Sequence, residues 1–210
     1  MGHNQREEDL NLGLGWLYYG LARLVRPRQA VIIGSWRGFV PLVIAKACHD
    51  NVERCDVRFV DPSLADDFWK DPAATQAHFR SFGLDNVRHH LHTTQEFVTT
   101  PEYQSLTDLG LIFIDGYHTA EQARFDYEAF ADRLAPRGLV LFHDSMILRP
   151  SPIYGHDRLY DVDVKHYMDE LRRDPGLQLL DLPFGTGQTV LRKVDGAHGE
   201  VLSTGPQGRV

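Results

Sequence analysis

Short apolar runs alternate with longer amphipathic segments along the chain. Runs in which consecutive positions are apolar predict strands buried on both faces of a parallel sheet, and they occupy residues 30–33, 57–60, 109–114 and 138–142. Apolar residues at helical spacing predict helices over residues 14–25, 39–47, 73–82, 123–134 and 164–171. A further strand is expected over residues 86–92.

The last two predicted strands, 177–182 and 188–194, are joined by a glycine-rich turn and form an antiparallel pair. Strands that alternate with helices of about 10–15 residues are typical of βαβ crossovers, so the sequence predicts a doubly wound, mostly parallel α/β sheet. No internal repeat or linker interrupts this pattern. We therefore expect one domain over residues 1–194, with a helix before the first strand, and a loose polar tail over 195–210.

Polar sequences follow four of the predicted strands. The carboxyl ends of parallel strands meet at one edge of a sheet, and ligands of open α/β sheets bind beyond that edge. We therefore expect the four sequences to converge on one site. They are Gly34-Ser35-Trp36-Arg37-Gly38, Asp61-Pro62-Ser63, Asp115-Gly116-Tyr117-His118 and His143-Asp144-Ser145.

The first two of these sequences favour a nucleoside cofactor. Gly34 and Gly38 lack the third glycine of the dinucleotide fingerprint, but glycine at a strand-to-helix turn allows positive φ and close approach of a ligand to the backbone. Asp61 ends the next strand, where its carboxylate is suited to accept hydrogen bonds from ribose hydroxyls. The alternatives are a tight turn that binds no ligand and an acid that only caps a turn.

Five segments together resemble class I S-adenosylmethionine-dependent methyltransferases, and in particular the small O-methyltransferase branch with Ile-Asp-Gly-x-His and His-Asp motifs. The segments are residues 31–38, 61–62, 114–118, 134–138 and 142–144. The resemblance extends over about residues 14–194 and is most specific between Asp115 and Asp144. It implies a Rossmann-like sheet of seven strands, in which the last hairpin places one strand antiparallel.

The resemblance also implies which residues hold the cofactor, S-adenosyl-L-methionine. They are Gly34, Ser35, Trp36, Gly38, Asp61, Pro62, Thr94, Asp115, Gly116 and Tyr117. The chain departs from the family at Ile32, where an acid is common, and at Val40 and Pro41, where small hydroxyl residues are common. The contacts to the methionine part of the cofactor are therefore less well defined than the contact to the ribose.

Methyl transfer to a hydroxyl requires that the acceptor be aligned with the methyl group and lose its proton. In metal-dependent relatives the positions that match Asp115, His143 and Asp144 carry the metal ligands, and the position that matches His118 carries the base. Asp115 and Asp144 end adjacent strands and are able to share a hard cation such as Mg²⁺, although the histidine between them is a less natural ligand for that ion. The alternative is that both acids cap loops or contact substrate without an ion, and that His118 is a structural partner of one of them.

Two further groups of polar residues are assigned different roles. His89, His90 and His92 alternate faces on a strand and have no metal-ligand spacing, so we expect them at a surface or sheet edge. The loop after the fifth strand is expected to select the acceptor, through Tyr154, His156, Asp157 and Tyr160.

Composition and charge exclude several partners. The chain has 210 residues and a formal net charge of −7, with no basic run that would bind a nucleic-acid backbone or an anionic membrane. No apolar stretch reaches the ~18 residues needed to cross a bilayer. Its two cysteines are too few for a disulfide framework and indicate a reducing cytoplasm.

The sequence therefore predicts an enzyme that transfers a methyl group from S-adenosylmethionine to a hydroxyl of a small molecule. Two alternatives are a non-catalytic partner or sensor that binds S-adenosylmethionine, and a nicotinamide oxidoreductase. The oxidoreductase would need the third glycine and an arrangement such as Tyr-x-x-x-Lys, which the chain lacks. A homo-oligomer is compatible with the sequence, and the acceptor is left open.

Overall fold

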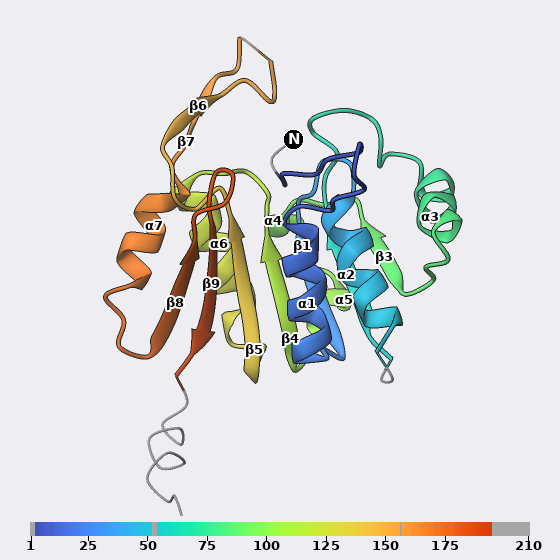
Figure 1. Ribbon diagram of the computed structural model, residues 1–210, viewed down its shortest axis with the longest axis horizontal. Helices are drawn as coiled ribbons and strands as arrows, with labels where there is room; N and C mark the ends of the chain where they lie inside the picture. The colour runs from blue at the N-terminus through green and yellow to red at the C-terminus, as the bar shows by residue number, and fades with distance from the viewer. Residues whose placement is uncertain (1–2, 52–53, 156, 195–210) are drawn as a thin grey trace, which may run out of the picture.

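The computed structural model describes residues 3–51, 54–155 and 157–194. Within them, seven strands form one sheet in the order β3-β2-β1-β4-β5-β9-β8 (Figure 1). Neighbouring strands are parallel except around β9, which runs antiparallel to both β5 and β8. The strands are β1 Gln29–Ile33, β2 Asp56–Val60, β3 Val87–His90, β4 Leu109–Ile114, β5 Leu134–His143, β8 Leu177–Leu182 and β9 Gln188–Lys193. The predicted fold class, including the antiparallel strand near the C-terminus, is confirmed.

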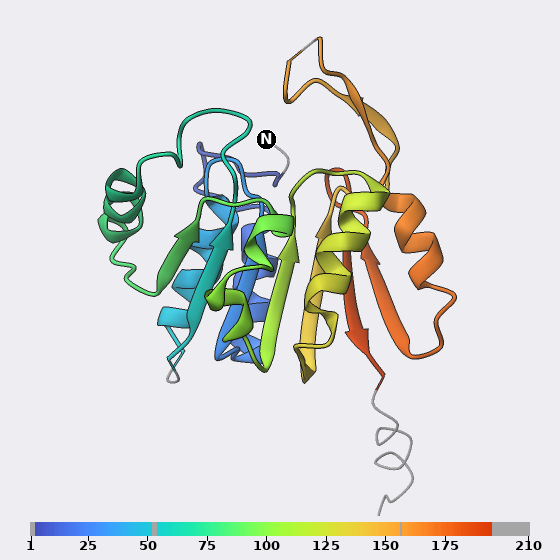
Figure 2. The ribbon, with the colours of Figure 1, turned by 180° about the vertical axis from the view of Figure 1, so that it is seen from behind.

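Helices cover both faces of this sheet (Figures 1 and 2). One face carries α1 Gly15–Val25, α2 Phe39–His49 and α3 Pro72–Ser81. The other face carries α4 Thr94–Phe97, α5 Pro101–Gln104, α6 Ala120–Ala131 and α7 Val164–Leu171. Two apolar clusters, one on each side of the sheet, form the core.

The central strand β4 shows why a strand that is buried on both faces needs apolar residues at consecutive positions. All six of its residues are buried. Successive side chains of a strand point to opposite faces, so Leu111 and Phe113 pack in the cluster under α1 and α2, whereas Ile112 and Ile114 pack in the cluster under α6 and α7. Burial of both faces leaves polar chemistry only at the ends of the strand.

The structure differs from the sequence prediction around Leu134. The helical spacing places Leu134 at the end of a helix, but α6 ends at Ala131 and Leu134 begins β5, where it pairs with Leu109 of β4. The strand pairing is favoured over a longer helix because it buries Leu134 in the cluster that also holds Leu109. The short helices α4 and α5 have only four residues each, too few to show a helical period.

A second correction concerns the segment after β5, which was expected as a polar loop. It forms a two-stranded antiparallel hairpin of β6, Arg149–Ser151, and β7, Tyr160–Val162. This hairpin rises beyond the carboxyl edge of the sheet, and the amino-terminal segment also crosses that edge (Figure 1). The tail over 195–210 and His156 lie outside the described residues. Among the described helices, none has the length and apolar character needed to span a membrane.

Candidate active site

The register of the sheet brings the four predicted polar sequences to one edge. Ile33 at the end of β1 pairs with Val60 of β2 and with Ile114 of β4, and Ile114 pairs with Phe142 of β5. The residues that follow these strand ends therefore start at the same level. The predicted convergence at the carboxyl edge is what the structure shows.

The turn after β1 accepts only glycine at its first position. Gly34 has φ +71°, and a Cβ placed on it would overlap the carbonyl oxygen of Asp115 and lie 2.6 Å from the Gly116 Cα. The Asp115 N–H in turn donates to the Ile33 carbonyl at 2.8 Å. The turn that starts the candidate cofactor loop is thus packed directly against the end of β4, which carries the candidate catalytic acid.

The rest of this loop rests on a tryptophan that sequence reasoning did not single out. Trp69 is buried, and its indole N–H donates to the Trp36 carbonyl at 2.6 Å. Gly38 has φ +78° and lies against the same indole. A Cβ placed on Gly38 would be only 2.6 Å from the Trp69 ring. Trp36 itself points outward, with 54% of its surface exposed and φ +44°. Its ring is therefore available to a ligand rather than used for packing.

Asp61 follows β2 and is buried beside the loop. Its Oδ1 accepts a hydrogen bond from the Ser63 N–H at 2.7 Å. Burial raises the pKa of Asp61 to about 6, although backbone hydrogen bonds from Ser63 and Ser35 act in the opposite direction. The Ser35 hydroxyl is buried and has no hydrogen-bond partner among the described residues. A buried hydroxyl without a partner next to a buried acid fits a polar ligand such as a ribose, because an unsatisfied buried group is costly.

The remaining residues predicted to hold the cofactor take varied positions. Pro62 follows Asp61. Gly116 lies beside Ile33, and a Cβ placed on it would make only an ordinary van der Waals contact with that side chain. Thr94 is buried at the start of α4 and hydrogen-bonds Asp126 of α6, whose pKa is raised to about 6 by burial.

Tyr117 faces the hairpin rather than the loop after β1. Its ring stacks on Tyr160 at 4.4 Å between centroids and on Tyr154 at 5.5 Å. Tyr117 keeps 41% of its surface exposed. The three rings form one aromatic group at the ends of β4 and β5, and the predicted contact of Tyr117 with the cofactor stays a prediction.

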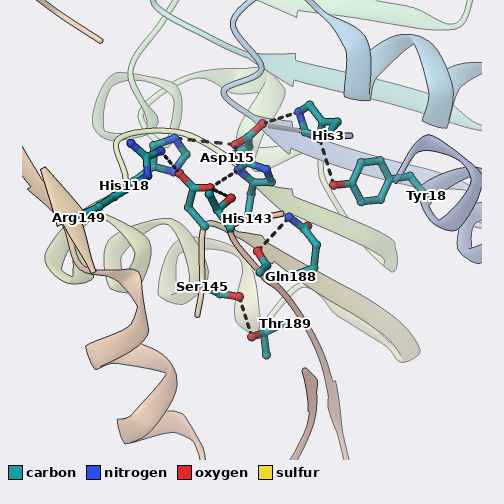
Figure 3. A network of polar contacts seen from close by, with 12 residues as sticks. His3, Tyr18, Asp115, His118, His143, Ser145, Arg149, Gln188 and Thr189 are labelled. Atoms are coloured by element: carbon teal, nitrogen blue, oxygen red, sulfur yellow. Dashed lines mark hydrogen bonds and ion pairs between the residues drawn. The ribbon is translucent and has the colours of Figure 1, made fainter. Parts of the chain in front are cut away.

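Asp115, His118 and His143 form a compact cluster at the ends of β4 and β5 (Figure 3). Nδ1 of His143 lies 2.9 Å from Asp115 Oδ1, and Nε2 of His118 lies 3.9 Å from the same oxygen. The side chains of Asp115 and His143 are more than nine-tenths buried. The predicted base and the predicted acid are therefore neighbours.

Asp144 belongs to a second ion pair beside this cluster. Its Oδ2 accepts a hydrogen bond from Arg149 Nη2 at 2.7 Å, and its Oδ1 accepts one from the Thr186 hydroxyl. Oδ1 also lies 3.2 Å from His143 Nδ1. The side chain of Asp144 is 2% exposed. Both carboxylate oxygens are thus already engaged by residues of the hairpin and of the turn between β8 and β9.

His3 enters the site from the amino-terminal segment, and sequence reasoning missed it. Its Nε2 lies 3.7 Å from Asp115 Oδ2, and its Nδ1 lies 3.1 Å from the Tyr18 hydroxyl (Figure 3). The rings of His3 and His143 are 4.7 Å apart. Burial lowers the pKa of His3 to about 4, so this ring is neutral at physiological pH. No local motif marks the residue, since only the path of the segment over the sheet edge brings it here.

The electrostatics favour an ionised acid beside a neutral imidazole. Burial alone would raise the pKa of Asp115, but His143, His3 and His118 outweigh it and lower the value to about 2. Burial lowers the pKa of His118, although Asp115 and Asp144 pull it upward. Near neutral pH, His118 is therefore an unprotonated imidazole that is able to accept a proton.

The donor set does not fit Mg²⁺. The predicted ligands were Asp115, His143 and Asp144, but the group whose donor atoms converge, all within 4.8 Å of one another, is Asp115, His118 and His143. That group offers two imidazoles and one carboxylate, whereas Mg²⁺ prefers an octahedron of oxygen ligands. Asp144 is held instead by Arg149 and Thr186. The side chains that converge here therefore do not supply the ligands that Mg²⁺ requires.

His89 and His90 lie on the edge strand β3, as expected, whereas His92 follows the end of that strand. They alternate between the two faces: His89 contacts Phe59 and its Nε2 donates to the Asp61 carbonyl at 3.0 Å, whereas His90 packs against Phe97. They take no part in the cluster around Asp115.

The doubly wound sheet with antiparallel β9, the glycine turn after β1 and the buried acid after β2 together define the class I methyltransferase fold. A family of methyltransferase domains matches residues 31–145, more than half of the 210 residues, and the chain belongs to this family. The predicted enzyme class, an S-adenosylmethionine-dependent methyltransferase, is thereby confirmed.

Solved structures share the fold at low sequence identity. The O-methyltransferase TomG from Streptomyces achromogenes, in complex with SAM, is 16% identical with a TM-score of 0.64, covering 90% of this chain and 86% of that one. The O-methyltransferase from Bacillus cereus, in complex with SAH, is 14% identical with a TM-score of 0.65, covering 92% and 84%. SAH-bound PaMTH1 from Podospora anserina is 17% identical with a TM-score of 0.64, covering 88% and 79%. No curated protein sequence matches the chain.

Proposed function

We propose that the chain transfers the methyl group of S-adenosylmethionine to a hydroxyl of a small molecule. The observation that carries this proposal is the pair of Asp115 and His118, an ionised acid and a neutral imidazole buried at the sheet edge directly beside the turn at Gly34. A base at this position has a purpose only if the acceptor must lose a proton. The non-catalytic sensor is disfavoured by the same pair.

The residues that would hold S-adenosylmethionine lie in the loops after β1 and β2. Asp61 is the candidate acceptor for the ribose hydroxyls, and Ser35 offers the buried hydroxyl that lacks a partner among the described residues. Trp36 presents an exposed ring beside them. TomG and the Bacillus cereus enzyme, which share the fold, were determined with SAM and SAH respectively, which supports the same ligand here.

In the proposed reaction the cofactor supplies a methyl group that its sulfonium has already activated. The acceptor oxygen forms a bond to the methyl carbon while the bond from sulfur to that carbon breaks, which leaves a neutral thioether. The proton of the acceptor hydroxyl passes to the imidazole of His118. Asp115 then lies beside the imidazolium and stabilises its charge, because its Oδ1 is 3.9 Å from His118 Nε2.

The acceptor would be a small hydroxylated molecule bound under the hairpin. The stacked rings of Tyr117, Tyr154 and Tyr160 supply an apolar wall at that end of the edge. The acidic net charge supports a small molecule over a nucleic acid or a membrane surface. A cytoplasmic location is proposed because Cys48 and Cys55 are both free and buried. The oligomeric state stays a prediction.

The test measures release of S-adenosylhomocysteine from S-adenosylmethionine against a panel of phenols, sugars and hydroxy acids. We expect turnover with at least one hydroxylated compound and none with its O-methylated counterpart. A reaction without protein serves as the control for non-enzymatic release. Tight binding of S-adenosylhomocysteine without turnover of any hydroxyl compound, but with turnover of amines or thiols, would contradict O-methyl transfer.

A further inference from the structure

We propose that Arg149 stands where metal-dependent methyltransferases place a divalent cation, so that the charge at the acceptor oxygen is compensated by a guanidinium group and the enzyme works without a metal. This inference rests on the proposed function. Sequence reasoning assigned no role to Arg149, which begins the β6–β7 hairpin.

The first support is the ion pair that Arg149 makes. Its Nη2 donates to Asp144 Oδ2 at 2.7 Å, and this carboxylate is almost fully buried. Asp144 has φ +54°, a backbone conformation that non-glycine residues rarely adopt, and this turn leads the chain from β5 into the hairpin. The backbone path after β5 thus brings the guanidinium of Arg149 next to the carboxylate of Asp144. A divalent cation would need that carboxylate as a ligand.

The second support is the balance of charge. The site holds two buried carboxylates: Asp115 is paired with His143 at 2.9 Å, and Asp144 is paired with Arg149 and accepts a hydrogen bond from Thr186. A divalent cation at Asp144 would meet a carboxylate whose two oxygens already accept hydrogen bonds from Arg149 and Thr186. The positive charge of Arg149 beside it would also repel the ion.

The third support is a free donor on the same guanidinium. Arg149 Nε is buried and has no hydrogen-bond partner within the described part of the chain. Arg149 lies beside His118 (Figure 3), and 38% of its side chain is exposed, so a ligand under the hairpin is able to reach it. A guanidinium carries five donors in a planar fork and stays charged at all physiological pH values. Nη2 can hold Asp144 while a second N–H donates to the acceptor oxygen.

The three residues then divide the work at the acceptor. His118 takes the proton, Asp115 stabilises the resulting imidazolium, and Arg149 stabilises the negative charge that develops on the oxygen until the carbon–oxygen bond forms. This arrangement suits an acceptor whose hydroxyl becomes an oxyanion at modest cost, such as a phenol. The stacked Tyr117 and Tyr160 rings are compatible with such an aromatic acceptor.

The first experiment measures metal binding and does not depend on the acceptor. Protein stripped with EDTA and saturated with S-adenosylhomocysteine is titrated by calorimetry with Mg²⁺, Mn²⁺ and Zn²⁺. We expect no saturable binding of any of the three ions at the site. The double variant His143→Asp, Arg149→Met restores oxygen ligands and frees Asp144, and we expect it to bind Mg²⁺ at least tenfold more tightly than the wild type.

Two outcomes of this experiment would overturn the inference. One is saturable Mg²⁺ binding to the wild type that Asp144→Asn weakens, because Asp144 would then be a metal ligand. The other is binding of Mn²⁺ or Zn²⁺ that His143→Ala abolishes, because two imidazoles and a carboxylate suit first-row transition ions. Either result leaves the proposed methyl transfer intact, since S-adenosylhomocysteine binding is measured separately in the same samples.

The second experiment uses an acceptor found in the hydroxyl panel. We expect kcat of Arg149→Met to fall about 10²- to 10³-fold, the range seen when one donor to a developing oxyanion is removed, with EDTA without effect on the wild type. Arg149→Lys keeps the charge but loses the fork, and we expect it to recover part of kcat. The matched control is Arg124→Met, which breaks an exposed ion pair between Arg124 of α6 and Glu170 of α7 and should leave kcat unchanged. An Arg149→Met enzyme as active as the wild type would refute the role of the guanidinium.

Discussion

The carboxyl edge of the sheet has two halves that are built in different ways. The half proposed to bind the cofactor, called the cofactor half, lies at the ends of β1 and β2 and is made by short continuous segments: the loop over 34–38 and the buried acid Asp61. The half proposed to bind the acceptor, called the acceptor half, lies at the ends of β4 and β5. It combines the strand-end residues with single residues from distant segments, namely His3, Arg149 and Thr186.

The two halves also depend on different physical effects. In the cofactor half the backbone is decisive, because Gly34 adopts a positive φ against the end of β4 and leaves no space for a side chain. In the acceptor half the charged side chains are decisive, because each buried carboxylate has to find a partner. Backbone requirements are visible as local motifs in a sequence, whereas charge pairing between distant residues is not.

The largest expected effect lies in the acceptor half. His118→Ala removes the proposed proton acceptor, so we expect kcat to fall by about 10²- to 10⁴-fold while the affinity for S-adenosylhomocysteine changes little. Since burial lowers the pKa of His118, the acidic limb of the wild-type pH–rate profile should lie below the usual histidine range and disappear in the variant. The measurement is kcat against pH for both proteins.

A different result would show that His118 binds the acceptor rather than accepting its proton. If kcat stayed within a few-fold of the wild type and only the acceptor KM rose, the imidazole would be an acceptor contact. A large loss of thermal stability without a ligand would instead indicate a structural partner of Asp115. The matched control is His166→Ala. His166 lies on α7 and is not a member of the cluster that the described residues Asp115, His118 and His143 form.

The same contrast decides how much the sequence could predict. The consecutive apolar residues of β4 and the polar residues after it were sufficient to place Asp115 and His118 at the edge, because strand ends in a parallel sheet share one level. His3 and Arg149 could not be predicted, since their positions depend on the path of the amino-terminal segment and on a hairpin whose strands have three residues each. Leu134 was misassigned because helical spacing ignores the strand partner that it finds in Leu109.

The second largest effect tests the cofactor half. A ligand at about one hundred times its Kd stabilises the native state by about 2.7 kcal/mol, which for a chain of this size is about 5–10 °C in Tm. We expect S-adenosylhomocysteine to raise the Tm of the wild type by that amount, and Asp61→Ala to remove most of the shift because the ribose hydroxyls lose their acceptor. NAD is the control ligand and should produce no shift. A full shift in Asp61→Ala would remove Asp61 from the ribose contact.

A third, smaller effect tests the backbone requirement itself. Gly34→Ala forces a side chain into a positive φ and against the Asp115 carbonyl, so we expect a loss of about 1–3 kcal/mol in the free energy of unfolding. The matched control is Gly20→Ala, because Gly20 lies within α1 with no atom near its would-be Cβ. That substitution should stabilise the protein by about 0.5–1 kcal/mol. Equal effects in chemical denaturation would show that the turn tolerates alanine.

The smallest expected effect concerns the ionisation of Asp61, whose pKa is raised by burial to about 6. In the ligand-free protein this burial penalises the carboxylate, so the folded state holds a proton that the unfolded state has lost between about pH 4 and pH 6. The contribution of Asp61 to stability is therefore most favourable below about pH 4, and it is lost as pH rises to about 6.

Cofactor binding should have the opposite dependence over the same interval. The ribose hydroxyls need the ionised form of Asp61 as an acceptor. The Kd of S-adenosylhomocysteine should therefore rise by up to about tenfold for each pH unit below 6 and be constant above pH 6. Calorimetry between pH 5 and pH 8 measures this slope. Asp61→Asn keeps the shape of the side chain but cannot ionise, so its weaker Kd should not vary with pH across that interval. A slope that persists in Asp61→Asn would assign the titration to another group, and the difference between the two halves would then no longer rest on a charge at Asp61.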